Sequence, residues 1–141
     1  MKDRLFFDAN LICYAFDANE PAKRAICQDL IKQVLNNEII GVVSNQVLGE
    51  IFNAATKKLK VTPHNAKIIV QAIIESDKWQ KINYTHDTIS RATERFEQSN
   101  VPFWDLVIIE TLKENNVTKI ITENERDFRG IQGIKVINPF K

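Results

Sequence analysis

The sequence predicts an α/β fold with a central, mainly parallel β-sheet of four or five strands flanked by helices as an α/β/α sandwich. Short apolar runs rich in Ile, Val and Phe alternate with longer segments whose apolar residues recur every three or four positions. This alternation is typical of parallel sheets, whose strands are joined by helical crossovers. With few Gly and Pro residues, no linker and no internal repeat, residues 1–141 are expected to form a single domain.

The elements of the N-terminal half follow in order. Residues 4–7 form a short apolar run that predicts a buried strand. Residues 21–36 predict a helix, with Pro in its first turn, and residues 38–44 predict a second buried strand. A helix beginning near residue 45 has a predicted core face made of Val47, Leu48, Ile51, Phe52 and Ala55.

The second half continues the alternation. Thr62 and Pro63 are typical of a helix start, and the core face of the helix is expected to be Ala66, Ile69, Val70, Ile73 and Ile74. Residues 81–84 predict a brief strand, and residues 85–98 predict a helix that buries Ile89, Ala92 and Phe96. The remaining expected elements are a helix that opens near Asp105, after a break, and strands at residues 119–122 and 135–137.

Composition excludes several classes of protein. A formal net charge of +1 provides no overall basic field for nucleic acid, although a local basic patch can serve a small site. No apolar run is long enough for a membrane span, and an acid interrupts the N-terminal segment where a signal peptide is apolar, so a cytoplasmic protein is expected. Cys13 and Cys27 are interpreted as reduced core residues, and His64 and His86 lack metal-ligand spacing.

Four acidic residues fall at predicted strand ends or in the helices that follow them. Asp8 comes directly after the first strand, and Glu50 lies in the second turn of the helix that follows the second strand. Asp105 opens an otherwise apolar helix, and Asp127 follows the strand at residues 119–122. Because parallel strands end at the same edge of a sheet, these four acids are expected to lie close together.

A cluster of carboxylates needs compensation, because like charges repel and push each group toward protonation. A hard divalent cation such as Mg²⁺ or Mn²⁺ resolves this conflict, since it prefers oxygen ligands and keeps some of its waters. Such a site can activate water and stabilise charge on a phosphoryl oxygen. The four acids therefore predict hydrolysis of a phosphodiester.

Each acid also has a simpler interpretation. Asp8 and Asp105 are suited to helix starts, Glu50 to a solvated helix edge, and Asp127 to a turn. Other families with an acid after a strand fit poorly: haloacid-dehalogenase-like phosphatases need a second Asp where Asn10 stands, and no Gly-rich phosphate loop is present.

Four stretches carry a family resemblance that covers essentially the whole chain. The start, LFFDANLICYAF, and the later SNQVLGEI, FWDLVIIETLKENNVTKIITENERDF and GIKVINPF resemble, in order, the motifs of PIN-domain ribonucleases, particularly VapC-type toxins of toxin–antitoxin pairs. The resemblance implies a PIN-like fold and an endoribonuclease that depends on Mg²⁺ or Mn²⁺ and cleaves an RNA substrate. It also implies a homodimer and, for a toxin, a cognate antitoxin that blocks the acidic cleft.

The resemblance also implies roles for individual residues. Asp8, Glu50 and Asp105 match the metal-binding acids. The fourth position is open: many members carry an acid where this chain has Asn124, so Asp127 takes that role, or, as a weaker candidate, Glu123. Residues expected to support the site are Asn10, which would orient Asp8 or a water, and Thr122, Glu123 and Asn124.

Two further functions remain as alternatives. A PIN-like scaffold made inert by its incomplete fourth position would bind RNA or protein without cleaving it. A nuclease for structured DNA would need additional helical elements, for which 141 residues leave little room.

Some neighbouring side chains fit more than one role. Phe103 and Trp104 fit either base stacking or packing under the helix start or in a dimer contact. The lysines near the end of the Glu50 helix and the arginines beside Asp127 fit either phosphate contacts or ordinary solvated charges: Lys57, Lys58, Lys60, Arg126 and Arg129.

Overall fold

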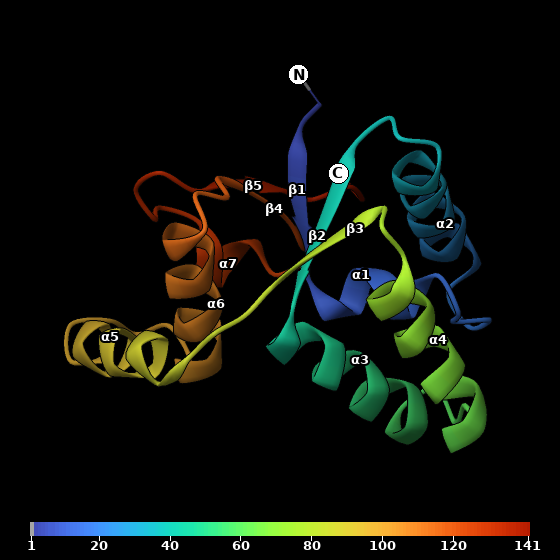
Figure 1. The fold of residues 1–141 in the computed structure, drawn as a ribbon, viewed down its shortest axis with the longest axis horizontal. Coiled ribbons are helices and arrows are strands. Elements are labelled where there is room, and N and C mark those ends of the chain that lie inside the picture. Colours follow the sequence, from blue (N-terminus) through green and yellow to red (C-terminus); the bar gives the residue numbers. More distant parts are fainter. Residues whose placement is uncertain (1) are drawn as a thin grey trace.

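The computed structural model describes residues 2–141 and contains a five-stranded, entirely parallel sheet (Figure 1). Its strand order is β3-β2-β1-β4-β5, and all four neighbouring pairs are parallel. The strands are β1 (Arg4–Phe7), β2 (Ile40–Ser44), β3 (Trp79–Ile82), β4 (Lys119–Ile121) and β5 (Lys135–Ile137). The sheet predicted from the alternation of elements is confirmed.

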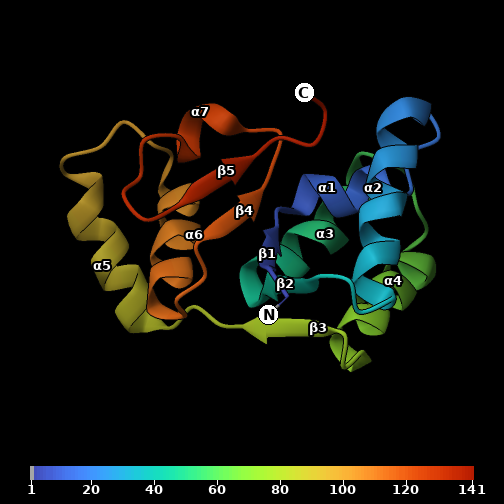
Figure 2. The same cartoon turned by 90° about the horizontal axis from the view of Figure 1, so that it is seen from above.

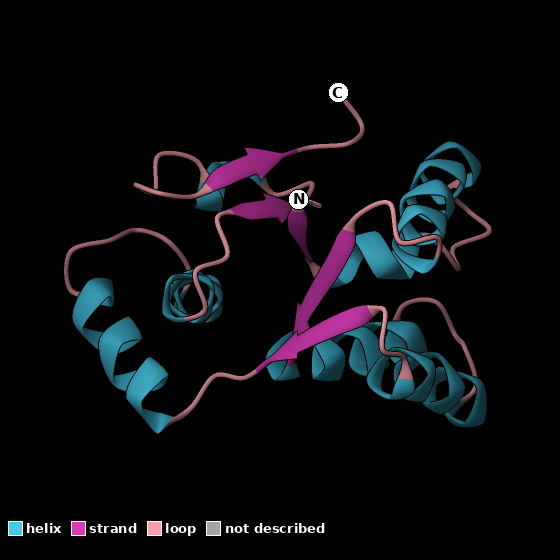
Figure 3. Ribbon diagram, turned by 45° about the horizontal axis from the view of Figure 1, so that its top comes forward, coloured by secondary structure: helices cyan, strands magenta, loops and turns pink. Residues whose placement is uncertain are grey.

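Helices cover both faces of the sheet and make three layers (Figures 2 and 3). One face carries α1 (Ala9–Tyr14), α2 (Pro21–Leu35), α3 (Asn45–Lys57) and α4 (Pro63–Glu75). The other face carries α5 (His86–Phe96), α6 (Phe103–Glu114) and α7 (Glu125–Phe128). Within residues 2–141, no helix is long and apolar enough to cross a membrane.

The centre of the sheet is where the chain changes direction. From β1 the chain winds outward through β2 to β3, and it then returns across the sheet to enter β4 on the other side of β1. Beside β1 and β4, the outgoing and returning connections therefore diverge to opposite faces, as they do at the switch points where parallel sheets bind ligands. The backbone N–H of Asp8 donates to the carbonyl of Ile121 at 3.1 Å, which ties together the carboxyl ends of these two strands.

The hydrophobic core lies between the sheet and its two helical layers. The largest fully buried side chains include Phe6 and Phe7 on β1, Ile120 and Ile121 on β4, and Phe128 on α7. Helix α6 is buried on nearly all sides, and every residue from 106 to 112 is buried. This burial explains why its sequence lacks the polar face that most surface helices have.

The third strand begins earlier than expected. It was predicted at residues 81–84, but β3 starts at Trp79, whose buried indole packs edge-on against Phe7 at a centroid distance of 5.1 Å. Tyr84 has already left the sheet, where its N–H donates to the side chain of Asn45 at 3.0 Å. The burial of the Trp79 ring therefore determines where this strand begins.

Three predicted core residues are exposed instead. Phe52 and Ile74 are 39% and 47% exposed, because each lies one position beyond a buried residue and is thereby rotated about 100° away from the core. Phe96 is 51% exposed in the last turn of α5, where it contacts Phe103 edge-on. All three segments are helical as predicted, but the buried face of each helix is narrower than the sequence predicts.

Two short helices were not predicted. Asp8 begins α1 as its N-cap, accepting a hydrogen bond from the N–H of Ala9 at 2.8 Å. Helix α7 occupies the segment that was expected to be a turn around Asp127. Both helices are under seven residues long, too short for a repeating apolar pattern to reveal them. Both cysteines are free; Cys27 is buried, and Cys13 is half-buried.

Gly41 on β2 provides a test of the packing that fixes β3. A Cβ added at this position would lie 2.6 Å from two Trp79 ring atoms and 2.9 Å from Val34. We expect Gly41→Ala to lower the free energy of unfolding by about 1–3 kcal/mol, because the sheet and α2 have no room to move apart. Chemical denaturation monitored by circular dichroism measures the change.

Gly49→Ala is the matched control for that substitution. Gly49 lies inside α3, and a Cβ there would meet no atom within 4 Å. Alanine is the better helix former, so this variant should gain roughly 0.5–1 kcal/mol. Equal stability of the two variants would contradict the packing described at Gly41.

Candidate active site

Four acidic side chains come from four different elements at the carboxyl edge of the sheet. Asp8 follows β1, Glu50 lies in the second turn of α3, Asp105 lies in the first turn of α6, and Asp127 lies in α7. All four are partly buried. The charge of Asp8 acts on both Glu50 and Asp105, and the charge of Glu50 also acts on Asp105, so these acids face a common space.

Asp8 is held by the start of α1 and by the residue that follows β4. Its Oδ1 accepts from the N–H of Ala9 at 2.8 Å, and its Oδ2 accepts from the Oγ1 of Thr122 at 2.8 Å. The hydroxyl of Thr122, which is fully buried, in turn accepts from the N–H of Asn124 at 3.0 Å. Each carboxylate oxygen keeps a further lone pair, so Asp8 is oriented and still able to bind a ligand.

Asn124 lies between two of the acids. Its Nδ2 donates to the Oδ2 of Asp127 at 2.8 Å and makes a longer contact of 3.4 Å with the Oδ2 of Asp105. The amide therefore bridges the loop after β4 to the first turn of α6. The position where the resemblance leads us to expect an acid carries a neutral donor that brings Asp105 and Asp127 together.

Gln46 was not anticipated from the sequence. It lies one helical turn before Glu50, and its Nε2 donates to the Oε2 of Glu50 at 3.3 Å and to the backbone carbonyl of Trp104 at 3.0 Å. It thereby connects α3 to the start of α6, directly beside Asp105. The i, i+4 spacing from Glu50 was the available signal, since residues four apart lie on the same helix face.

Burial and mutual repulsion shift the pKa values of the acids. Burial raises the pKa of Asp105 to about 7, and a hydrogen bond to Asp127 and the charges of the other three acids act in the same direction. Burial also raises the pKa of Asp8 and of Glu50. The pKa of Asp127 is lowered, chiefly by the hydrogen bond from Asn124. Near neutral pH, the proton of this pair therefore resides on Asp105.

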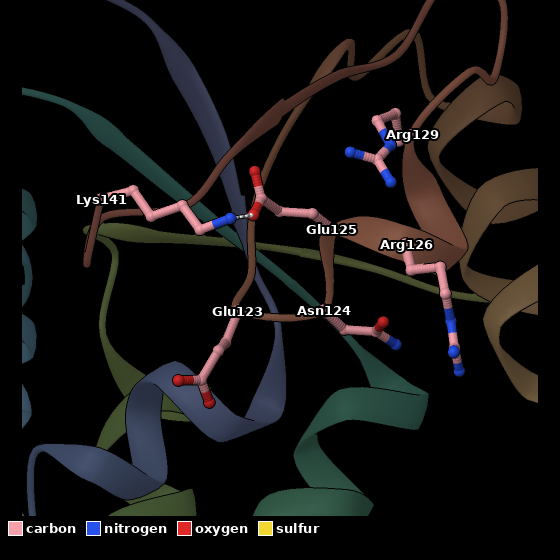
Figure 4. A pocket seen from close by; sticks show the side chains of 6 residues that line it. All are labelled: Glu123, Asn124, Glu125, Arg126, Arg129 and Lys141. Atoms are coloured by element: carbon pink, nitrogen blue, oxygen red, sulfur yellow. Dashed lines mark ion pairs between the residues drawn. The ribbon is translucent and has the colours of Figure 1, made fainter.

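Glu123 points away from the cluster. Its Oε1 accepts from the Tyr14 hydroxyl at 2.6 Å, and its carboxylate forms an ion pair with Lys23 that lowers its pKa. Figure 4 shows the carboxylate directed toward α1, while the neighbouring Asn124 amide points in another direction. Of the two acidic candidates for the fourth position, only Asp127 faces the other acids.

The donor set fits a hard divalent cation in its chemistry. Every candidate ligand is an oxygen, and the buried Oδ1 of Asn10, two residues after Asp8, has no hydrogen-bond partner within residues 2–141. Across the same residues, no three acidic, His or Cys side chains are arranged so that they could hold a metal ion together. Ions such as Mg²⁺ commonly bind through one or two carboxylates and several waters, so an open arrangement suits them.

The aromatic and basic neighbours of the cluster differ in exposure. Trp104 is 50% exposed and contacts Tyr84 and Phe103 edge-on, whereas Phe103 is half-buried. Arg126 lies 3.9 Å from Asp127 and is almost fully exposed, a distance and setting that give a weak ion pair. Arg126 and Arg129 line a depression of about 380 Å³ together with Asn124 (Figure 4).

Comparison with known proteins identifies the family to which this arrangement corresponds. The family model described as PIN domain matches residues 5–134, which include β1 from its second residue through β4 and end directly before β5. No curated protein sequence matches the chain.

Solved structures with the same fold include toxins of toxin–antitoxin pairs. VapC20 of Mycobacterium tuberculosis, described as a sarcin–ricin loop cleaving toxin, is 16% identical with a TM-score of 0.68, covering 88% of this chain and 92% of its own. A toxin–antitoxin complex from Klebsiella pneumoniae is 21% identical with a TM-score of 0.66 and covers 97% and 98%. The DNA-bound VapBC of Salmonella typhimurium is 19% identical with a TM-score of 0.65 and covers 99% of each chain. At these identities, the likeness is one of fold.

The raised pKa of Asp105 makes the stability of the metal-free protein depend on pH. Because the native carboxyl binds a proton more tightly than the unfolded one, its contribution to stability is complete below about pH 4 and is lost as the pH rises through about 7. We expect Asp105→Asn to remove much of this decline and to be the more stable protein at pH 8, by on the order of 1 kcal/mol. Thermal unfolding in EDTA from pH 4 to 8 measures the slope.

Asp77→Asn is the control, because it removes one negative charge from an exposed position between α4 and β3. Its pH profile should be parallel to that of the unchanged protein. An Asp105→Asn profile that also runs parallel would show that this carboxyl does not hold a proton at neutral pH.

Proposed function

The chain belongs to the PIN-domain family, and from that premise we propose that it is a divalent-metal-dependent endoribonuclease that hydrolyses RNA phosphodiester bonds. The observation that carries the proposal is the convergence of Asp8, Glu50, Asp105 and Asp127 on one space at the carboxyl edge of the sheet. A fold alone permits many functions, so the acids carry more weight than the architecture. Burial, together with the three other acids, raises the pKa of Asp105 to about 7, and such an arrangement is costly for stability and typical of a functional site.

In this proposal Asp8, Glu50 and Asp105 hold Mg²⁺ or Mn²⁺, and Asp127 completes the site. A bound divalent ion supplies positive charge that activates water and offsets the charge developing on the phosphate. Thr122 fixes the orientation of the Asp8 carboxylate, while Asn124 keeps Asp127 ionised next to Asp105. These neutral donors position the acids without adding charge to the cluster.

The proton on Asp105 is the natural competitor of the cation. Below pH 7 this carboxyl retains its proton in the metal-free protein, so ion binding must displace it. Affinity for Mn²⁺ is therefore expected to increase with pH up to about 7. Gln46 holds the neighbouring Glu50 through a hydrogen bond that favours its ionised form.

We further propose that the protein acts as the toxin of a toxin–antitoxin pair in the cytoplasm. Support comes from structural neighbours whose descriptions name toxin–antitoxin complexes, together with the near-complete coverage of both chains. A cognate antitoxin would neutralise the protein by covering the acidic cleft. The family resemblance implies a homodimer, which we propose as the working assembly.

The second candidate function is a catalytically inert PIN-like module that binds RNA or protein. The observation that favours it is Asn124, a neutral residue where the family commonly has an acid. Calorimetry with Mn²⁺ separates the two: heat of binding that disappears in Asp8→Asn supports a metal enzyme, and absence of binding to the unchanged protein supports the inert module.

Loss of either central acid should abolish cleavage while the fold survives. We expect Asp8→Asn and Asp105→Asn each to reduce Mn²⁺-dependent cleavage of total RNA by at least about 100-fold, because each removes a charged ligand. Circular dichroism should show native secondary structure for both variants. Unchanged cleavage by both variants would sink the assignment of the site.

A second pair of variants tests which acid fills the fourth position. Glu123→Gln should retain most RNA cleavage, because that side chain engages Tyr14 and Lys23 instead of the other acids. Asp127→Asn should lower cleavage by roughly tenfold or more. The opposite ranking of the two cleavage rates would assign the fourth position to Glu123.

A further inference from the structure

A cleft of about 640 Å³ begins at two of the acids and extends along α3. Its acidic end is formed by Asp8 and Glu50, and its far end is formed by Lys57 and Lys58. Between these ends lie the amide side chains of Asn10 and Asn53, which are able to donate and accept hydrogen bonds.

The helix itself places these groups in line. Glu50, Asn53 and Lys57 are spaced by three and four residues, so they lie on one face of α3. At 1.5 Å per residue, Lys57 lies roughly 10 Å along the axis from Glu50. Lys58 follows as the C-cap residue, and its charge acts on the thiol of Cys13, which lines the same cleft.

Neither lysine is neutralised within the described part of the chain. Lys57 and Lys58 form no ion pair with any of residues 2–141, whereas Lys23, Lys119 and Lys141 each pair with a carboxylate. Both are exposed at the rim of a cleft whose other end carries acids. The helix separates these two free positive charges from Glu50 by about two helical turns.

Lysines at the end of a helix also have a purely structural use, since they complement the helix dipole. That role requires only proximity to the last turn and no particular face. It leaves unexplained why both lysines line the same cleft as Asp8 and Glu50.

We propose that Lys57 and Lys58 bind a backbone phosphate of the RNA strand, close along the strand to the phosphate that is cleaved. This inference rests on the proposed ribonuclease function of the acids. A stacked strand carries a phosphate about every 3.4 Å along its axis, so the lysines meet one within about three nucleotides of the scissile bond. Asp17 and Glu20 line the same cleft and repel phosphate, which confines the strand to the α3 wall.

The test compares two double variants with the same loss of charge. Lys57→Gln/Lys58→Gln removes the proposed phosphate contacts, and Lys32→Gln/Lys67→Gln removes two exposed lysines from α2 and α4. Fluorescence anisotropy with a labelled single-stranded RNA in EDTA measures binding without metal-dependent cleavage. Because both variants lose two charges, any difference between them reports position and not net charge.

We expect the α3 variant to bind RNA roughly tenfold more weakly at low salt. Its slope of log affinity against log salt should be shallower by about 0.7, which is the contribution of one phosphate contact on a single strand. The control variant should keep the slope of the unchanged protein. With Mn²⁺, the α3 variant should show a higher KM for a ten-nucleotide RNA at a nearly unchanged kcat.

Substrates with a neutral methylphosphonate at single positions locate the contact. One position, within about three nucleotides of the cleaved bond, should make the unchanged protein and the α3 variant bind equally well. Equal affinity and salt slope for both double variants would overturn the inference while leaving the nuclease function intact. Weaker RNA binding by the α3 variant, in a protein that cleaves no RNA, would support the phosphate contact and count against the nuclease.

Discussion

The junction of β1 and β4 is the constraint on which the candidate site depends. At this point the backbone N–H of Asp8 donates to Ile121, the last residue of β4, while its side chain accepts from Thr122, the residue that follows this strand. A one-residue slip of either strand would turn Asp8 or Thr122 to the opposite face of the sheet. The buried runs on both strands prevent such a slip, so the register of the core also orients the first acid.

The four acids repel one another, and the packing of α6 in the core stabilises the fold enough to hold Asp105 beside the others. Asp105 lies directly before a continuous run of buried residues, from Leu106 to Leu112, that cannot leave the core without exposing a large apolar surface. Burying such side chains stabilises the fold by roughly 1.5–3 kcal/mol each, well above the repulsion among partly solvated carboxylates. A proton on Asp105 relieves the remaining strain when no cation is bound.

The parallel sheet could be predicted from the sequence because it depends on periodic signals, and the four candidate acids could be selected because they follow predicted strands. The parallel sheet follows from alternating apolar segments, and Asp8 stands out directly after one of them. What could not be predicted depends on single contacts between distant residues. Glu123 and Asn124 are neighbours in the chain, yet their side chains point in different directions. Glu123 binds Tyr14 and Lys23, whereas Asn124 donates to Asp105 and Asp127. The role of Gln46 in connecting α3 to α6 depends on its hydrogen bond to the carbonyl of Trp104, which is distant in the sequence.

The burial of α6 also limits how this site is able to diversify. Any substitution that shifts α6 to suit a different ligand must disturb the packing of the core. The position of Asp105 is therefore expected to stay the same in variants of the chain. The half-exposed Trp104 just before it, and the exposed end of α3, are free of that restriction. In the proposed nuclease, changes of substrate preference should therefore accumulate at these two places, while the central acids stay the same.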